Sequence, residues 1–585
     1  MKKLPPWLEA RYECLWQQFR DAPFRFRNAI KLIKETSGDS KEQVSVALSE
    51  LGKAGLLEKE PDPEDARKRI YRLKSKSDLM AGTITELSRG DLDTLIWEAA
   101  NLIRNRLDYT AILFLLFYKL ISDKSEGEVK NSRAQALTGE LDGKAAQDKA
   151  AKAAYHEFDI PEGCLWESLC KDRKELPGKF SRAMEVLAKR NPEFRDLFEA
   201  TGFAEFAGNP ENSDILSQLV ELFSGQRLDR VSPDLLGNAY ERVLRFYAPL
   251  KAREVNVYTP REVTQLLVRM LGPKPGESVY DPAMGFGGML ISSYQHVKNE
   301  KGKPQADKLS LFGQELEPKI LALARMNLSI NDIKDTHLSQ GNSLMSPEFK
   351  EGDKMQTFDL VLANPPWNLK GYWEGILINS ELCQERFGYG FPPYKSADWA
   401  WIEHMMASAK PEGGRVGVVM DIGCLFRGGM ERVIRTGMIE KDLLDTVILL
   451  PENLFYNTRV PGTILVFRHR KPDVRKGKVL FIDVSREYEQ HPEFRKLIRL
   501  GPRQQNGIAE AYSGFRDIKG FSRVVPLEEI RENDYNLIVT RYVPPVEKHG
   551  EIDIPKVRKE LKQLDAELEK ATRILEGYLD ELGYK

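Results

Sequence analysis

Four consecutive residues carry the clearest chemical signal in this sequence: Asn364-Pro365-Pro366-Trp367. The exocyclic amine of adenine is a poor nucleophile because its lone pair is delocalised into the ring, so an enzyme must hold both N–H bonds. The Asn364 side-chain oxygen can accept one of them, and the Pro365 carbonyl, kept extended by Pro366, can accept the other. Trp367 offers a flat face for stacking, worth about 1–3 kcal/mol per base. The tetrapeptide therefore indicates methyl transfer to an amine of a nucleic-acid base.

The element that must position this tetrapeptide is the apolar run just before it, residues 358–363. A short apolar run bounded by a breaker is typical of a central strand in a parallel sheet. Ligands bind at the carboxyl ends of such strands. The alternative is a plain turn or packed linker, because Asn-Pro and Pro-Pro also mark loops. The neighbouring motifs decide between the two.

A second signal is the glycine-rich segment that runs from Ser278 to Gly288. It predicts a strand, an acid and a turn before a helix that begins near residue 288. Glycines allow the backbone to approach a ligand closely. A dinucleotide-binding turn is the competing interpretation, but Leu290 stands where its third small residue should be. Asp281 would repel a pyrophosphate, whereas it could receive the ammonium group of S-adenosylmethionine.

Three further segments would complete a cofactor site, two of them after the glycine-rich segment and one before it. Glu315 ends the next predicted strand, where an acid typically accepts the ribose hydroxyls. Asn342 closes the third strand and could contact the cofactor's adenine. Upstream, Thr259-Pro260-Arg261-Glu262 predicts a capping box with Thr259 as the cap. The free amides of that helix would favour the cofactor carboxylate.

Length and composition limit the kind of protein that can carry these motifs. A chain of 585 residues is longer than one hydrophobic core can accommodate, so three or four domains are expected. The formal net charge is only -1, so DNA contact must come from local patches or partners. The five cysteines form no Cys-x-x-Cys pair, which argues against structural zinc or a disulfide frame and suits the cytoplasm. The sequence shows neither the apolar core of a signal peptide nor a run of 18 apolar residues. Secretion and membrane insertion are therefore not expected.

The first 80 residues predict a winged-helix-like module. Val44, Ala47, Leu48 and Leu51 recur at helical spacing after the predicted cap Ser40, and the basic segment 67–73 follows as a wing. Residues 1–80 hold 17 Lys and Arg against 13 Asp and Glu, which mildly favours phosphate contact. A protein-docking module with a solvated charged wing is the equal alternative.

The rest of the chain divides into helical and alternating parts. Buried helices are expected over 91–122, an exposed excursion over 124–154 and further helices over 159–250. From 255 to 485 strands and helices alternate, as in a doubly wound sheet. The candidate strands are 277–281, 309–314, 337–341, 358–363, 414–420, 443–450, 463–468 and 479–484.

The last predicted helix carries a narrow apolar seam. Its members are spaced alternately by four and three residues, which is typical of a coiled coil; they are Val557, Leu561, Leu564, Leu568, Ala571, Leu575, Tyr578 and Leu582. A partner helix is expected, and the alternative is that the seam packs on its own domain.

Together these blocks resemble the amino adenine-N6 DNA methyltransferases, and specifically the modification subunit of type I restriction-modification systems. The resemblance spans roughly residues 90 to 585. The blocks that carry it include 95–100, 237–241, 258–261, 281–288, 313–315, 364–367, 387–390, 397–398, 425–429 and 459–461.

The resemblance implies that Asn364, Pro365, Pro366 and Trp367 hold a flipped adenine of duplex DNA. It further implies S-adenosyl-L-methionine as the cofactor and no metal, with a cofactor site made of Tyr258, Thr259, Pro260, Asp281, Ala283, Met284, Gly285, Gly287, Glu315 and Asn342. Two residues depart from the family pattern. Trp367 replaces the usual phenylalanine or tyrosine, and Asn342 replaces the commoner aspartate, so its oxygen would still accept a bond from the adenine amine.

The resemblance also implies partners: double-stranded DNA, a specificity subunit, a restriction (motor-nuclease) subunit and a second modification subunit. The insertion 368–397 is expected to form a loop over the extruded base. The expected domains are a winged-helix-like module (1–80), a helical domain (90–250), an α/β Rossmann-like methyltransferase domain (251–545) and a coiled-coil helix (550–585). The alternatives are a methyltransferase of protein glutamine amides and a DNA-binding regulator with an inert methyltransferase domain.

Overall fold

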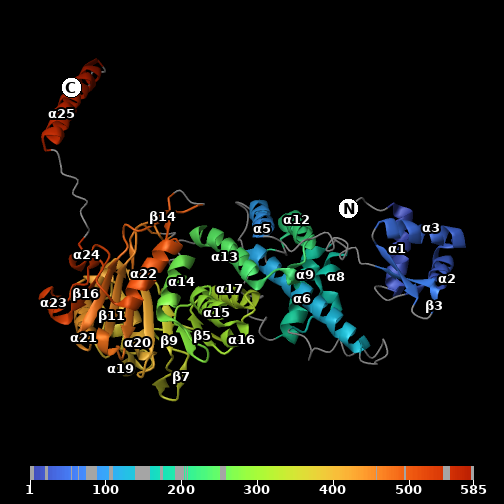
Figure 1. Cartoon of the computed structure of the whole chain (residues 1–585), viewed down its shortest axis with the longest axis horizontal. Coiled ribbons are helices and arrows are strands. Elements are labelled where there is room, and N and C mark those ends of the chain that lie inside the picture. The colour runs from blue at the N-terminus through green and yellow to red at the C-terminus, as the bar shows by residue number, and fades with distance from the viewer. Residues whose placement is uncertain are drawn as a thin grey trace.

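The computed structural model describes residues 5–19, 24–54, 56–62, 65–73, 89–103, 110–138, 158–171, 175–191, 209–250, 259–455, 458–492, 496–544 and 554–581, with Phe203 and Phe206. Figure 1 shows an N-terminal module, a group of helices, a sheet-containing part and a final helix. Within these ranges, no helix has the length and apolar character needed to cross a membrane.

The N-terminal module has the element order of a winged helix. It consists of α1 (Pro6–Phe19), β1 (Phe24–Arg25), α2 (Phe26–Ser37), α3 (Lys41–Lys53), β2 (Leu57–Asp62) and β3 (Asp65–Leu73). The strands form an antiparallel sheet in the order β1-β3-β2. The predicted apolar face of α3 is buried, and the Ser40 side chain caps this helix by accepting from the Gln43 amide. The module has its own hydrophobic core, between Leu8 and Leu73.

The helical part confirms helices on both sides of the predicted excursion. Its main helices are α5 (Arg89–Ile103), α6 (Thr110–Thr138), α8 (Trp166–Cys170), α9 (Leu176–Arg190), α12 (Ser213–Ser224) and α13 (Pro233–Leu250).

The expected excursion over 124–154 is wrong in its first half, because α6 continues to Thr138. Polar contacts hold helix α6 just before residue 124 and just after it. Lys119 Nζ donates to Asp123 Oδ2 over 2.7 Å, and Arg227 donates to Glu126 over 2.7 Å. Residues 139–157 lie outside the described part of the chain.

The central sheet contains all eight predicted strands. They are β4 (Ser278–Asp281), β5 (Ser310–Glu315), β6 (Thr336–Gln340), β9 (Leu360–Ala363), β10 (Arg415–Asp421), β11 (Leu444–Leu449), β12 (Gly462–Arg468) and β13 (Lys478–Asp483). The sequence interpretation missed the edge strand β16 (Ser522–Pro526). The order is β16-β13-β11-β12-β10-β9-β4-β5-β6.

The sheet is mixed, although β9 lies in its parallel part as predicted. The strands β10, β9, β4, β5 and β6 are parallel, whereas β12 runs antiparallel to both of its neighbours. The chain reverses direction across the sheet between β4 and β9, because β5 and β6 lie on one side and β10 on the other. Ligand sites of open α/β sheets lie at such a switch point.

Helices cover both faces of the sheet, which explains why its strands are apolar throughout. Alternate strand residues pack on α14 (Arg261–Leu271), α15 (Gly288–Lys301) and α22 (Pro502–Gly514). The intervening residues pack on α20 (Asp398–Ala407) and α21 (Met430–Glu440). All four residues of β9 are buried.

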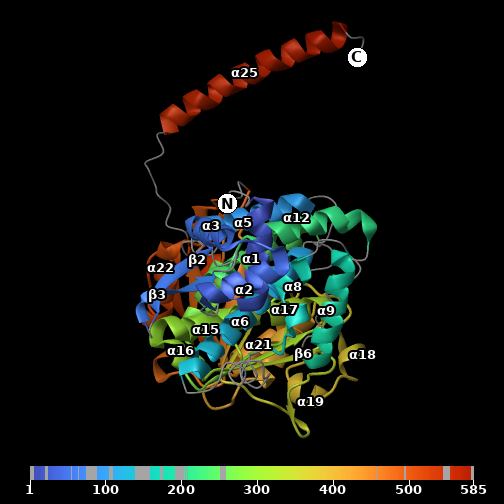
Figure 2. The ribbon, with the colours of Figure 1, turned by 90° about the vertical axis from the view of Figure 1, so that its right-hand side faces the viewer.

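The final helix, α25 (Ile554–Glu581), stands apart from the other elements in both views (Figures 1 and 2). The seam leucines at 561, 564, 568 and 575 are 54–66% exposed. The alternative that the seam packs on its own domain is therefore wrong for these residues. The side chains of Val557, Tyr578 and Leu582 lie outside the described part.

Candidate active site

A cavity of about 300 Å³ lies at the carboxyl ends of β4, β5 and β9. Small-molecule sites in proteins begin near this size. Both groups of predicted residues reach it. From the predicted cofactor set, the cavity is lined by Thr259, Asp281, Ala283, Met284, Gly285, Glu315 and Asn342; from the tetrapeptide, it is lined by Asn364 and Pro366.

The remaining predicted residues do not line the cavity. Pro260, Gly287, Pro365 and Trp367 are not among the residues that line it, and Tyr258 lies outside the described residues. Gly287 serves the turn instead, because it adopts a left-handed φ of +80° just before α15 begins. Only glycine takes this conformation without strain.

Backbone contacts hold the glycine-rich turn against the end of β5. The Gly285 amide donates to Glu315 Oε2 over 3.0 Å, and the Met284 amide donates to the Gln314 carbonyl over 3.1 Å. Gly285 itself has a left-handed φ of +53°. The turn and the acidic strand end therefore form one rigid wall of the cavity.

The electrostatics of the cavity favour a cationic ligand. Burial raises the pKa of Asp281 well above its usual value, and the nearby Glu315 raises it further. Burial also raises the pKa of Glu315. Glu241 and Glu317 line the same cavity, and Arg261 is the one cationic side chain among its described lining residues, with its Nη1 atom 4.0 Å from Glu241 Oε2. Buried carboxylates are costly unless a positive charge pairs with them.

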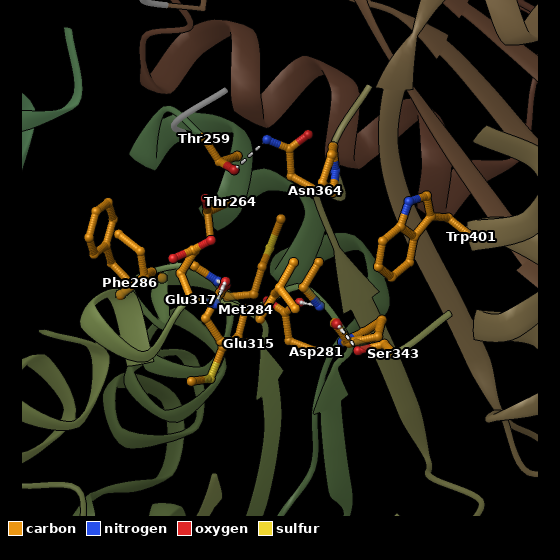
Figure 3. A pocket seen from close by; sticks show the side chains of 18 of the residues that line it. Thr259, Thr264, Asp281, Met284, Phe286, Glu315, Glu317, Ser343, Asn364 and Trp401 are labelled. Carbon is orange, nitrogen blue, oxygen red and sulfur yellow. Dashed lines mark hydrogen bonds between the residues drawn. The ribbon is translucent and has the colours of Figure 1, made fainter. Parts of the chain in front are cut away.

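The predicted capping role of Thr259 is wrong. Helix α14 begins at Arg261, and its N-cap is Pro260, which forms no side-chain cap. The Thr259 hydroxyl instead accepts a hydrogen bond from Asn364 Nδ2 over 2.8 Å (Figure 3). The threonine thus joins the start of α14 to the tetrapeptide 105 residues later.

Trp367 fixes the other side of the Asn364 carboxamide. Its indole Nε1 donates to Asn364 Oδ1 over 2.9 Å and to the Val419 carbonyl over 3.2 Å. An indole N–H can only donate, so the amide atom that faces it must be the oxygen. The Trp367 ring packs edge-on against Phe455, with centroids 4.9 Å apart. The stacking of Trp367 on a target base stays a prediction.

The larger tryptophan fits because a glycine faces it. A Cβ atom on Gly462 would lie 2.6 Å from the Phe455 ring and 3.2 Å from the Trp367 ring. The first contact is closer than packed atoms tolerate, and the second is tight, so a side chain at this position would displace the Phe455 ring that packs on Trp367. The departure from the phenylalanine or tyrosine of the family pattern is thus accommodated by the neighbouring strand β12.

The Asn342 side chain holds the turn after β6, and its contact with the cofactor's adenine stays a prediction. Its oxygen accepts from the backbone amides of Leu344 and Met345 over 3.2 and 3.3 Å. The Asn342 Nδ2 donates to the Tyr372 hydroxyl over 2.8 Å. Asn342 therefore shapes the turn after β6 and anchors Tyr372, which comes from the insertion 368–397 and lines the cavity.

A buried ion cluster holds the chain just after the tetrapeptide. Arg427 Nη1 donates to Asp398 over 2.9 Å and to Glu431 over 3.1 Å. Asp398 Oδ1 accepts from the Asn368 amide over 2.8 Å, and Arg427 also bonds the Asn368 side chain. Both carboxylate side chains are at most 1% exposed. The cluster ties the insertion to α20 and α21.

The sequence interpretation missed the residues that close the cavity from outside the sheet. Glu241 and Leu244 come from α13 in the helical part. Glu241 lies in the block 237–241, for which the sequence predicts no role in the site. Trp401 of α20 also lines the cavity and is 6% exposed (Figure 3). Its indole N–H has no hydrogen-bond partner among the described residues.

Comparison with known proteins identifies this arrangement. Residues 231–551 match the N-6 DNA Methylase family, and residues 92–223 match the HsdM N-terminal domain. The type I restriction enzyme MjaVIII methylase subunit of Methanocaldococcus jannaschii is 37% identical over 99% of this chain and 98% of its own length. The chain belongs to the type I restriction enzyme methylase subunits.

Other members of the family agree. The HindI methylase subunit of Haemophilus influenzae is 29% identical over 67% of this chain and 91% of its own length. The crystal structure of a type I restriction-modification system methyltransferase subunit from Streptococcus thermophilus has a TM-score of 0.66 and 25% identity, covering 78% of this chain and all of that one.

Membership confirms the predicted activity. The chain is an adenine-specific DNA methyltransferase, the modification subunit of a type I restriction-modification system. A protein glutamine-amide methyltransferase and a regulator with an inert domain are not favoured. The family matches begin at residue 92, so the N-terminal module lies outside both of them.

Proposed function

We propose that the cavity binds S-adenosyl-L-methionine, which supplies the methyl group when bound. The observation that carries this proposal is the excess of carboxylates that line the cavity, among which Asp281 is fully buried. Asp281 would pair with the cofactor's ammonium group, and Glu315 would accept its ribose hydroxyls. The cofactor's positive charges would lower the cost of keeping both side chains ionised. A dinucleotide, with its negative phosphates, would raise that cost.

The flipped adenine would be held by the tetrapeptide above this site. Trp367 and Thr259 fix the Asn364 carboxamide so that its oxygen can accept from the target amine. A carbonyl oxygen accepts two hydrogen bonds, so the bond from Trp367 is compatible with one from adenine. The Pro365 carbonyl would hold the second N–H. The methylated amine is a cationic acid that loses its proton readily, so no strong general base is required.

Duplex DNA is the proposed substrate, and the proposed partners follow the family. A specificity subunit would choose the adenine, a restriction subunit would carry out cleavage, and a second modification subunit would complete the assembly. The exposed leucine seam of α25 would supply one contact between subunits.

The decisive experiment combines the purified chain with its specificity subunit, duplex DNA and S-adenosylmethionine. We expect N6-methyladenine, measured by mass spectrometry of digested DNA. Asn364→Ala should lower its formation by more than about 100-fold while cofactor affinity stays near normal, because Asn364 holds the target amine. Asp281→Asn is the complementary control and should weaken cofactor binding itself.

The outcomes separate the parts of the proposal. N4-methylcytosine as the product would contradict the assignment of the base. Normal cofactor affinity in Asp281→Asn would contradict the assigned cofactor site. If Asn364→Ala methylated DNA at the normal rate, the tetrapeptide would not hold the reacting amine.

A further inference from the structure

The N-terminal module contains a helix–turn–helix that the methyl transfer described above does not use. Helices α2 and α3 are joined by the three residues Gly38, Asp39 and Ser40. Gly38 has a left-handed φ of +71°, and its amide donates to the Lys34 carbonyl. A short turn with a glycine in this conformation is typical of the motif.

A buried ion pair fixes this turn against α1. Arg11 Nε donates to Asp39 Oδ2 over 2.6 Å, and Arg11 Nη2 donates to Asp39 Oδ1 over 2.8 Å. Asp39 is only 6% exposed. The two bonds form a bidentate pair, which restricts orientation as well as distance. The angle between α2 and α3 is therefore held by a specific contact as well as by the apolar core.

The outer face of α2 is positively charged. Arg27, Lys31 and Lys34 are spaced by four and three residues and are all exposed, whereas Ala29 and Ile33 on the opposite face are buried. None of the three basic residues forms an ion pair with another described residue of the chain. We call these three residues the basic stripe. On the wing, Arg69 is also exposed.

The outer face of α3 has the composition of a surface that enters a groove. Ser45 and Ser49 are exposed, and Val46 between them is 53% exposed. Hydroxyl groups can bond to base edges, and a small apolar group can contact a thymine methyl. Among the described residues of α2 and α3, Val46 is the one large apolar side chain that is exposed, whereas the centre of a protein interface needs several.

We propose that this module is a second DNA-binding site, in which α3 enters the major groove and the basic stripe of α2 contacts the phosphate backbone. In helix–turn–helix proteins the second helix lies in the major groove while the first crosses the backbone. The site would contact DNA outside the base being methylated. It would add affinity and orientation to the complex.

The test compares full-length variants by fluorescence anisotropy on a short labelled DNA duplex over a range of NaCl concentrations. The variant Arg27→Ala/Lys31→Ala/Lys34→Ala should bind DNA about tenfold or more weakly at low salt. Its slope of log affinity against log salt should fall by up to about 2.7, because each phosphate contact contributes about 0.9.

The matched control is Lys274→Ala/Lys301→Ala/Lys308→Ala, which removes the same charge. Lys274 and Lys308 precede β4 and β5, at the sheet edge opposite the cavity. The control should bind DNA like the parent protein. Cofactor affinity should be unchanged in both variants. Because binding is measured without methyl transfer, a failure of the proposed cofactor site would not affect this result.

A second variant tests the groove contact itself. Ser45→Glu/Ser49→Glu adds two negative charges to the outer face of α3. The helix itself should be kept, because glutamate favours a helix more than serine does. It should also bind DNA at least tenfold more weakly. Normal DNA affinity in this variant would overturn the groove contact. Unchanged affinity and slope in the stripe variant, with loss of co-purification of the specificity subunit, would show that the module docks a protein instead.

Discussion

At the scale of single residues, the Asn364 carboxamide lies between a hydroxyl and an indole. Thr259 accepts from its nitrogen, and Trp367 donates to its oxygen. Neither contact was expected from the sequence, where Thr259 was interpreted as a helix cap and Trp367 as a stacking surface. The two contacts determine which amide atom can meet the target amine.

This arrangement predicts that Trp367→Phe is impaired even though an aromatic ring remains. Phenylalanine lacks the N–H that orients the amide oxygen. Single-turnover methylation should slow about 2- to 10-fold, as expected for one hydrogen bond of 0.5–1.5 kcal/mol. Cofactor affinity and thermal stability should change little.

The comparison with Trp367→Ala separates the two roles of this residue. If ring contact alone matters, Trp367→Phe should match the parent and only Trp367→Ala should be slow. That result would contradict the orienting role of the indole N–H.

At the scale of elements, the segment after the tetrapeptide is held by contacts with helices that follow it in sequence. Arg427 precedes α21, Asp398 begins α20, and both contact Asn368. The side chain of Glu403, in the middle of α20, accepts from the Tyr389 amide over 2.9 Å. These polar contacts position the start of the insertion 368–397, at Asn368, and its later part, at Tyr389.

Removal of Arg427 should destabilise this region strongly. Arg427→Ala leaves the buried carboxylates of Asp398 and Glu431 without their shared cation, which costs about 3–5 kcal/mol for such pairs. We expect a lower melting temperature and weaker methylation. Arg432→Ala is the matched control, because Arg432 is 47% exposed and pairs with the exposed Asp534. Equal melting temperatures of the two variants would contradict the role of the cluster.

Glu403 should make stability depend on pH. Burial raises its pKa from 4.5 in the unfolded chain to about 8 in the folded protein. The folded state therefore binds this proton more tightly. The contribution of Glu403 to the free energy of unfolding is greatest below pH 4.5 and falls as the pH rises to about 8.

Glu403→Gln should remove this loss, because glutamine keeps the oxygen that accepts from Tyr389 and carries no charge. Between pH 6 and 8 the free energy of unfolding of the parent protein should fall by about 2 kcal/mol more than that of the variant. Melting temperatures across this range measure the difference. Parallel pH profiles for the two proteins would show that Glu403 titrates normally.

At the scale of the whole molecule, the cavity is completed by a part of the chain that precedes the sheet. Helix α13 packs closely on α17 (Pro318–Ile330): a Cβ atom on Gly237 would lie 2.4 Å from the Asn331 side chain. The Tyr240 hydroxyl donates to the Leu323 carbonyl over 2.9 Å. These contacts bring Glu241 and Leu244 to the cavity wall.

The leucine seam of α25 should be needed for assembly and dispensable for cofactor binding. Leu564→Asp places a charge on the seam and should greatly reduce co-purification with the specificity subunit. Gln563→Asp is the matched control, because it introduces the same charge one residue away from the seam. Normal assembly of Leu564→Asp would contradict the predicted helix pairing.

The sequence by itself determined the strands, the order of the motifs and the chemistry of the tetrapeptide. Apolar runs with flanking breakers are local signals, and all eight strands were predicted from them. Asp281 and Glu315 end their strands and Asn364 follows its own; the three strands are parallel, so a shared sheet edge was enough to bring these residues together.

Only the tertiary structure decided which atoms these residues use and what closes the site. The bonds from Asn364 to Thr259, from Trp367 to Asn364 and from Asn342 to its own turn depend on side-chain geometry that spacing does not encode. The antiparallel direction of β12 and the approach of α13 likewise depend on packing between segments far apart in the chain. Local sequence predicts elements, whereas long-range packing sets the direction of each polar group.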